Sequence, residues 1–288
     1  MKQLRHFLFF GVGFLLFFYG STILDSSKKA LSLWFEVLVP SMFVSLICIR
    51  YLYYQGLFPS LHLPLLEKTF HMNQYALSLF FCILLLGFPN GALLIEEAYQ
   101  QQRLTHRQAK RLLYTCSIAS PGFILISCGI GIFQSAQIGW RLFLIQIAAV
   151  ALLLLIKRST PISMLPLQTE TKSLKAAMLD SGLSLFMLGG YLMLVTSITA
   201  VICLWLSPSQ CHIVQMLSEF SSGIFLSMTL PYPLVIKQLL ICILLSFGGF
   251  CVHLQTRSLC SFPYSYACYC GFRILQAVLA SILFLFLL

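Results

Sequence analysis

Two carboxylates, Glu36 and Glu219, lie within strongly apolar segments of the chain. An acidic group is costly in hydrocarbon, so in a membrane segment it usually faces a cavity or a partner and marks a functional site. A helix breaker follows each glutamate four residues later, Pro40 and Gly223 respectively. The spacing predicts two re-entrant helical hairpins. In them each glutamate is a proton or cation relay, a hydrogen-bond acceptor for a substrate, or a hairpin-tip residue near the membrane interface, where burial costs little. The two segments are Ala30–Tyr53 and Ile213–Leu230.

Two other apolar stretches are interrupted near the middle by glycine. Leu77–Ile95 contains Gly-Phe-Pro-Asn-Gly at 87–91, and Leu234–Leu254 contains Ser-Phe-Gly-Gly at 246–249. Unpaired backbone groups are very unfavourable in lipid, so such breaks persist only where protein or a water-filled cavity surrounds them. The half-helix after a break presents free N–H groups and about half a positive charge, which suits an anion. Paired breaks in two chain halves are typical of a transporter's binding site.

Ser117–Gly122, with Pro121, is a third interruption and indicates either a further break or a kink. The alternative interpretation of all these small residues is close helix packing, because glycine and serine are frequent at membrane helix interfaces. Past the second glycine break, two polar side chains could reach a cavity or cap the helix end. The predicted substrate-binding residues are Glu36, Pro40, Ser41, Gly87, Pro89, Asn90, Gly91, Ser117, Ser120, Glu219, Ser221, Ser222, Gly223, Ser246, Gly248, Gly249, His253 and Gln255.

The composition indicates the class of protein that carries these breaks. The chain has 288 residues, is 59% hydrophobic and 9% charged, and its mean hydropathy is +0.91. Soluble domains carry about 25% charged residues, so an all-α polytopic membrane protein is expected. The net charge of +10 comes from Lys and Arg in short loops, as the positive-inside rule predicts for membrane proteins. Nucleic acid is therefore not an expected partner.

The apolar pattern predicts about seven transmembrane helices plus the two re-entrant hairpins, arranged in two related halves. The halves are 1–157 and 176–288, joined by a linker at 158–175. The first span has a basic start, and a cleaved signal peptide is the alternative interpretation. We prefer an uncleaved span because no small-residue cleavage site is convincing. The expected spans are Phe7–Leu24, Leu77–Ile95, Leu113–Phe133, Ile138–Ile156, Leu179–Leu206, Leu234–Leu254 and Gly271–Leu288.

Enzyme signatures are absent from the sequence: no HExxH, GxSxG, Walker A or dinucleotide-binding pattern occurs in a suitable setting. An intramembrane hydrolase or lipid transferase stays a minor alternative without a visible nucleophile–base pair. Most of the eleven cysteines lie in apolar stretches, where a thiol acts as a small hydrophobe. Cys260, Cys268 and Cys270 cluster without metal-binding spacing. We expect no enzyme activity, no cofactor and no metal.

Several stretches follow one another in chain order and together form a pattern. They are Leu33–Ser41, Gly87–Ala92, Leu104–Leu113, Cys116–Pro121, Glu219–Gly223, Ser246–Phe250 with Gln255, and Arg273–Ala277. In these stretches the chain resembles the sporulation integral membrane proteins with nucleoside-recognition (Gate) domains, a family with a stage V member implicated in dipicolinate transport. Four residues differ from those usual in that family: Val44, Ser117, Ile118 and Cys251.

The resemblance implies a multi-pass protein of a bacterial cell membrane, in the outer forespore membrane of sporulating cells. Its implied function is to carry dipicolinate, a small organic anion, from the mother cell towards the forespore. It also implies a likeness in fold to concentrative nucleoside transporters. Besides the substrate and the lipid bilayer, a coupling proton or cation and a second copy of the chain are compatible partners.

Two other functions stay open at the level of sequence. One is a nucleoside or nucleobase carrier, in which Glu36, Glu219 and Asn90 contact ribose and base. The other is a non-transporting scaffold or assembly factor for spore formation, with the polar stretch Glu96–Arg111 as its partner surface. Within that stretch, Thr105 and the glutamine three residues later form a capping-box pattern that predicts a helix start.

Overall fold

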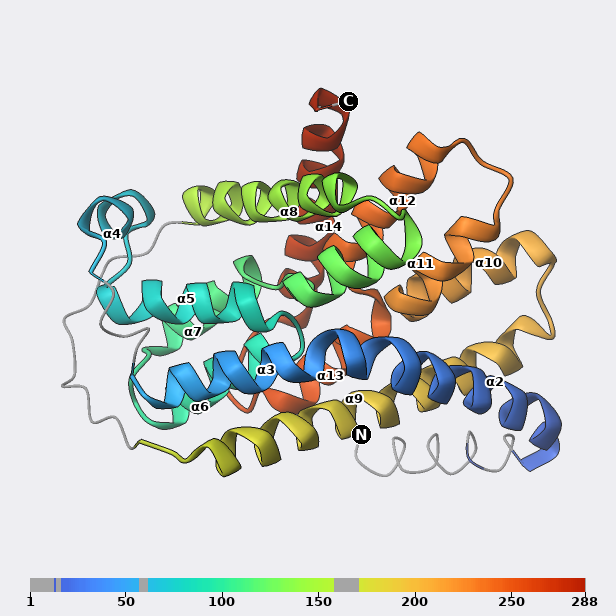
Figure 1. The fold of residues 1–288 in the computed structure, drawn as a ribbon, viewed down its shortest axis with the longest axis horizontal. Helices are drawn as coiled ribbons and strands as arrows, with labels where there is room; N and C mark the ends of the chain where they lie inside the picture. Colours follow the sequence, from blue (N-terminus) through green and yellow to red (C-terminus); the bar gives the residue numbers. More distant parts are fainter. Residues whose placement is uncertain (1–12, 14–16, 57–61, 158–170, 288) are drawn as a thin grey trace.

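A computed structural model describes residues 13, 17–56, 62–157 and 171–287, and every regular element in these ranges is a helix (Figure 1). Five helices are long and apolar enough to cross a membrane, or six if the bent pair α4–α5 is one span. The chain is thus an all-helical, multi-pass membrane protein. The five are Gly20–Tyr54, Ala136–Ile156 (α8), Leu174–Cys203 (α9), Leu234–Leu259 and Tyr266–Phe286 (α14).

The hairpin predicted within Ala30–Tyr53 is wrong, because the chain forms one continuous helix of 35 residues, Gly20–Tyr54. A wide π-helical turn precedes Pro40, and in it the Val39 N–H bonds to the carbonyl of Trp34. Such a turn shifts the hydrogen-bond pattern by one residue, which accommodates a proline that has no N–H to donate. The parts of this helix are α2 (Gly20–Ser32), η1 (Leu33–Leu38) and α3 (Val39–Tyr54).

Half of the expected first span, Phe7–Leu24, lies outside the described residues, and so does most of the predicted linker at 158–175. The division into two related halves therefore stays a prediction.

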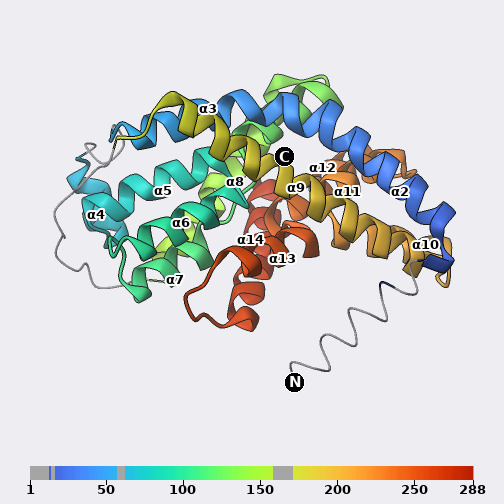
Figure 2. The same cartoon turned by 90° about the horizontal axis from the view of Figure 1, so that it is seen from below.

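Helix α9 runs antiparallel to the long first helix and packs along it (Figures 1 and 2). At one end the Tyr54 hydroxyl donates to Asp180 Oδ2 at 2.5 Å. Towards the other end the hydroxyls of Ser27 and Ser197 lie 3.0 Å apart. These contacts fix the register of two long helices that belong to different predicted halves.

The first glycine-broken stretch is broken at residues 87–89, between α5 (Gln74–Leu86) and α6 (Asn90–Gln100). Asn90 and Gly91, predicted as part of this break, lie in the first turn of α6 instead. Helix α5 is also bent by 87° against α4 (Pro64–Phe70), which precedes it. The span predicted at Leu113–Phe133 is wrong as one helix. A non-helical segment, residues 116–120, separates α7 (His106–Thr115) from the π-helical η3 (Gly122–Ile132).

A helical hairpin and the second glycine break lie in the predicted second half, residues 176–288. Helices α10 (Pro208–Ser218) and α11 (Phe220–Thr229) fold back on each other. Helix α12 (Leu234–Phe247) is followed by α13 (Gly249–Leu259), and only Gly248 lies between them. Ser246, predicted as part of this break, lies inside α12 instead.

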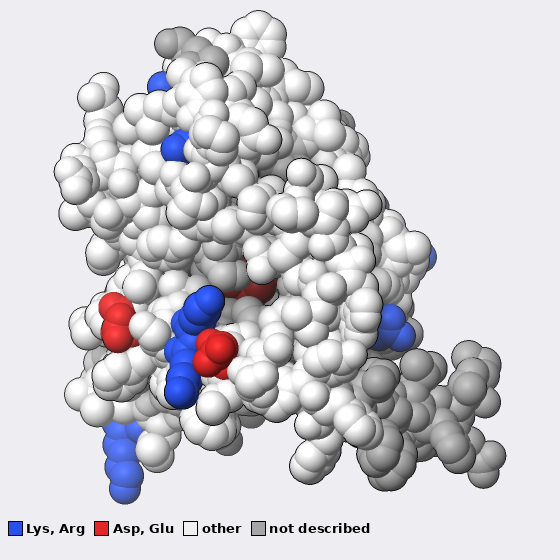
Figure 3. All heavy atoms as spheres, turned by 90° about the vertical axis from the view of Figure 1, so that its right-hand side faces the viewer, with Lys and Arg blue, Asp and Glu red and all other residues white. Residues whose placement is uncertain are grey.

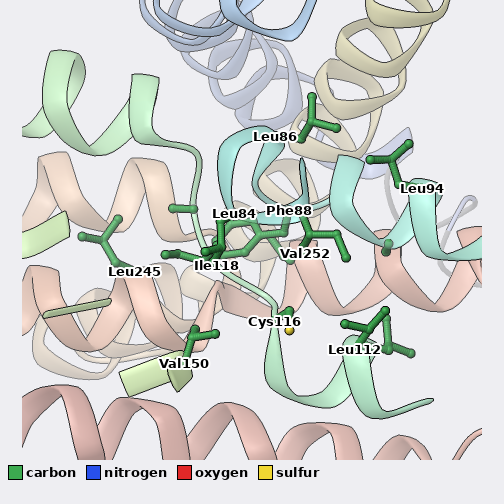
Figure 4. Packing of buried hydrophobic residues seen from close by; sticks show 14 of the residues in the cluster. Leu84, Leu86, Phe88, Leu94, Leu112, Cys116, Ile118, Val150, Leu245 and Val252 are labelled. Atoms are coloured by element: carbon green, nitrogen blue, oxygen red, sulfur yellow. The ribbon is translucent and has the colours of Figure 1, made fainter. Parts of the chain in front are cut away.

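The buried core surrounds the broken helices rather than one long span. Figure 4 shows Phe88, Ile118 and Val252 together at its centre, each from a different broken segment. Large apolar side chains on the long helices point outward instead, among them Trp140 on α8 and Phe186 on α9. An apolar exterior around a core of interrupted backbone is the arrangement expected in lipid.

Candidate functional site

The breaks that the sequence places far apart meet in the folded chain. The backbone N–H of Phe88, between α5 and α6, donates to the carbonyl of Ile118 at 2.7 Å. Gly87 has a left-handed backbone, with φ +68°, and an added Cβ would overlap the backbone nitrogen of Ser120. Glycine is required here because two unwound segments cross without room for a side chain.

The second glycine break touches the tip of the α10–α11 hairpin. A Cβ added to Gly249 would lie 2.9 Å from the backbone nitrogen of Phe220, and its φ is +70°. Gly248, with φ +81°, lies against the ring of Phe88. All four non-helical points of the core therefore meet: the α5–α6 break, the segment 116–120, the hairpin tip and the α12–α13 break.

The hairpin turns at Glu219 itself and not at Gly223, which corrects the predicted position of the break. The Glu219 carboxylate accepts from the N–H groups of Ser221 at 3.0 Å and Ser222 at 2.6 Å, so it caps the start of α11. A carboxylate at a helix N-terminus is stabilised by the helix dipole. Gly223 lies inside α11, where an added Cβ would lie 2.7 Å from the Cα of Met216 in α10.

A buried arginine satisfies the carbonyl groups that the end of α7 leaves free. Arg273 of α14 is only 1% exposed and donates to the carbonyls of Tyr114 and Ser117. Backbone carbonyls without a helical partner need such a donor when water is excluded. The unwound segment is thus held by side-chain hydrogen bonds as well as by packing.

Three cavities lie in a row along the two antiparallel helices, the long first helix and α9. The Lys29 cavity, of about 380 Å³, contacts Lys29 on α2 and Thr196 on α9. The central cavity, of about 20 Å³, contacts Met42 and Leu192. The Arg50 cavity, of about 220 Å³, contacts Arg50 on α3 and Ser184 on α9.

The Lys29 cavity opens on the face where the hairpin meets α2. Its polar lining includes Asp25, Lys29, Gln215 and Ser222, and Glu219 also contributes to it. In Figure 3, acidic atoms lie within a hollow of this face, with basic and acidic atoms beside it. This cavity is the larger of the two that flank the hairpin tip.

The central cavity is narrowed by three aromatic rings. The Phe220 ring at the hairpin tip packs edge-on against Phe88, with centroids 5.1 Å apart, and against Phe123 at 5.2 Å. Gln255 and Glu219 also line this space. A volume of about 20 Å³ holds about one water molecule, so the central cavity has no room for a larger solute.

The Arg50 cavity contains the most informative polar groups. Arg50 is 1% exposed, and one of its terminal nitrogens donates to Ser184 Oγ at 3.3 Å. Its Nε has no hydrogen-bond partner in the described part of the chain. Asn90, at the start of α6, and Gln255, whose Oε1 is also unpaired among the described residues, line the same space. A guanidinium beside two amides can hold a carboxylate.

The predicted site residues divide into three groups. Pro89, Asn90, Ser120, Glu219, Ser222 and Gln255 line the three cavities. Glu36 and Pro40 are exposed and line none of them. The others serve packing or hydrogen bonds nearby: Ser41, Gly87, Gly91, Ser117, Ser221, Gly223, Ser246, Gly248, Gly249 and His253.

His253, which the sequence allows to reach a cavity or to cap the helix end, lines none of the three cavities. It is fully buried on α13, and its Nε2 lies 3.0 Å from the carbonyl of Phe247. Its Nδ1 lies 3.5 Å from Cys270 Sγ and from the Tyr266 hydroxyl. These partners and the surrounding rings indicate that His253 ties α13 to α14.

The charged residues of the Arg50 cavity were missed at the level of sequence. They are Arg50, Glu97 and Asp180. Each lies near the end of an apolar stretch, where a charge is normally at the membrane surface. One sequence feature did point to a buried site, because Arg50 and Glu36 are two charged residues in one apolar segment. The cavity itself is visible only once α9 packs against that segment.

No family model, curated protein or solved structure matches this chain. The described helices define a multi-pass membrane protein, and the candidate site rests on its own geometry.

Proposed function

We propose that this protein is a membrane transporter of a small organic anion, with the Arg50 cavity as its binding site. The observation that carries the proposal is the buried guanidinium of Arg50, whose Nε lacks a hydrogen-bond partner within the described residues although it lies beside a cavity of about 220 Å³. A buried charge in a membrane segment marks a substrate or ion pathway. Free N–H donors on Arg50 match the oxygens of a carboxylate.

The row of cavities supports transport rather than binding alone. Lys29 and Arg50 are 21 positions apart on one continuous helix, which is about 31 Å at 1.5 Å per residue. This length is close to the thickness of the hydrocarbon core, about 30 Å. A closed constriction near the middle, with a larger cavity on each side, is the arrangement that alternating access needs.

The α10–α11 hairpin is the proposed moving element. Its tip carries Glu219 and Phe220, and both line the central cavity. Gly249 meets the tip without a side chain, so the contact between hairpin and broken helix is made by backbone. Withdrawal of Phe220 from Phe88 would join the central cavity to the Lys29 cavity. We also propose that the hairpin and the two broken stretches belong to two related halves of the chain.

Dipicolinate is the leading candidate substrate, carried across the outer forespore membrane during sporulation. It is a small, flat ring with two carboxylates. Arg50 would hold one carboxylate through paired hydrogen bonds, while Asn90 and Gln255 would orient the ring nitrogen and the second carboxylate. These roles follow from the donors and acceptors that line the Arg50 cavity.

A nucleoside or nucleobase is the second candidate. Gln255 Oε1 lacks a hydrogen-bond partner among the described residues and can accept from a base or a ribose hydroxyl. The scaffold hypothesis has less support, because Arg111 of its proposed partner surface is 2% exposed and donates to the carbonyls of Phe70, His71 and Leu154.

Competition in proteoliposomes tests the substrate class. Purified protein is reconstituted, and uptake of radiolabelled dipicolinate is measured with excess unlabelled dipicolinate, isophthalate or uridine outside. The proposal predicts inhibition by both dicarboxylates and no effect of uridine. Uptake of labelled uridine that dipicolinate does not compete with would support the nucleoside candidate instead. Uptake of neither label above empty liposomes would contradict transport of either class.

A further inference from the structure

The Arg50 cavity contains more negative than positive charge. Glu97 of α6 and Asp180 of α9 line it together with Arg50. Within the described residues no carboxylate oxygen lies within 4.0 Å of the Arg50 guanidinium. A dianionic solute beside Arg50 therefore also meets two carboxylates across a small space. Like charges in a low-dielectric cavity repel strongly, so the solute binds well only if one of the carboxylates is neutral.

Glu97 is the carboxylate best suited to take up a proton. Its side chain lines the cavity and has no hydrogen-bond donor among the described residues. Asp180, by contrast, already accepts a hydrogen bond from the Tyr54 hydroxyl, at 2.5 Å. A neutral Glu97 would also gain an O–H donor for the solute.

The groups that face Glu97 come from two packed helices. Arg50, Tyr53 and Tyr54 lie on α3, Asp180 lies in the second turn of α9, and Lys172 lies just before α9. Burial raises the pKa of Glu97 above its ordinary value. Arg50 and Lys172 oppose this rise and Asp180 adds to it.

The two acids expected from sequence to relay protons are less suitable. Both Glu219 oxygens are engaged with Ser221 and Ser222. Glu36 is exposed on the outer face of the long helix and lines none of the three cavities. Neither group faces Arg50.

We propose that the Arg50 cavity takes up its anion together with a proton on Glu97, so that anion entry and proton entry are coupled. The inference rests on the proposed anion transport. Solute binding favours the protonated form of Glu97, so binding must in turn take up a proton. Affinity is then highest at low pH and falls as pH rises through the pKa of Glu97. Because one proton is taken up per anion, the affinity falls at most tenfold for each unit by which the pH rises.

The test uses proteoliposomes that contain a trapped pH-sensitive dye, so dipicolinate uptake and internal acidification are recorded together. Wild-type protein is expected to acidify the interior when dipicolinate is added outside, and its uptake is expected to fall as the outside pH rises from 6 to 8. Benzene-1,3-disulfonate stays fully ionised in this range and serves as a second probe, which shows whether the pH dependence belongs to the protein.

Glu97→Gln imitates the protonated side chain. We expect this variant to keep dipicolinate uptake, to lose the pH dependence and to lose internal acidification. Glu36→Gln is the matched control and should behave as wild type. Asp180→Asn should keep the pH dependence.

Two failures are distinguishable. Absence of dipicolinate uptake by wild type at any pH would contradict the proposed function and with it this inference. Wild-type uptake without acidification, or an unchanged pH slope in Glu97→Gln, would overturn the coupling alone.

Discussion

Phe88 donates its backbone N–H to the carbonyl of Ile118 at 2.7 Å, so two interruptions from different helices satisfy each other. Each break alone would leave unpaired backbone groups in a membrane. Crossed, they form a hydrogen-bonded centre that the hairpin tip and the α12–α13 break then complete. Asn90 and Gln255 lie beside this centre and line the Arg50 cavity.

Gly249→Leu is expected to abolish transport and to leave membrane insertion intact. The added Cβ would lie 2.9 Å from the Phe220 nitrogen at a φ of +70°, so the hairpin tip must move away. Gly271→Leu is the matched control, since an added Cβ there meets nothing within 4 Å. The measurement is dipicolinate uptake normalised to the amount of protein in the membrane fraction. Normal uptake by the Gly249 variant would contradict the proposed contact between hairpin and broken helix.

Arg273→Gln is expected to destabilise the folded protein. It removes the donor for the carbonyls of Tyr114 and Ser117, and a buried acceptor left unpaired costs about 1–3 kcal/mol. Thermal unfolding in detergent, followed by loss of the monodisperse peak, should occur several degrees lower than in wild type. The exposed Arg257 provides the control, Arg257→Gln, with little change expected. Equal stability of the two variants would show that the unwound segment does not depend on Arg273.

Phe220→Ala should open the constriction between the Lys29 cavity and the central cavity. Cys251 lines the central cavity and is 2% exposed, so a small water-soluble thiol reagent should label it faster in this variant. Peptide mass spectrometry separates Cys251 from the other cysteines. Phe250→Ala, which removes an exposed ring on α13, should leave the labelling rate unchanged. A rate that does not rise in Phe220→Ala would argue against this ring as the barrier.

The sequence predicted the breaks that local chemistry dictates. Gly87 and Gly248 adopt the positive φ angles that glycine adopts easily, and Thr105 and Gln108 form the expected capping box. The prediction of a hairpin at Pro40 was wrong because a π turn accommodates the proline within a continuous helix. The residue pattern does not indicate this π turn. The hairpin break lies at Glu219 because its carboxylate caps the following helix.

Tertiary packing determined what the sequence did not predict. The sequence around Arg50 indicates a charge at the end of a span, exposed at the membrane surface. In the structure α9 covers Arg50, which is 1% exposed and lies beside a cavity. Conversely, Glu36 lies in a strongly apolar segment, but the helix turns it outward. Which face of a long helix is covered depends on partners far along the chain. Periodicity within the segment alone therefore could not separate these two residues.

Equilibrium binding of dipicolinate to the purified protein tests the central claim, that an anion enters a protein-enclosed chamber and is held by Arg50. Titration calorimetry at pH 6 compares wild type, Arg50→Gln and the control Arg257→Gln. The account predicts saturable binding to wild type and to the control, and at least a tenfold weaker affinity for Arg50→Gln. Equal affinity of all three proteins, or no binding to wild type, would contradict it.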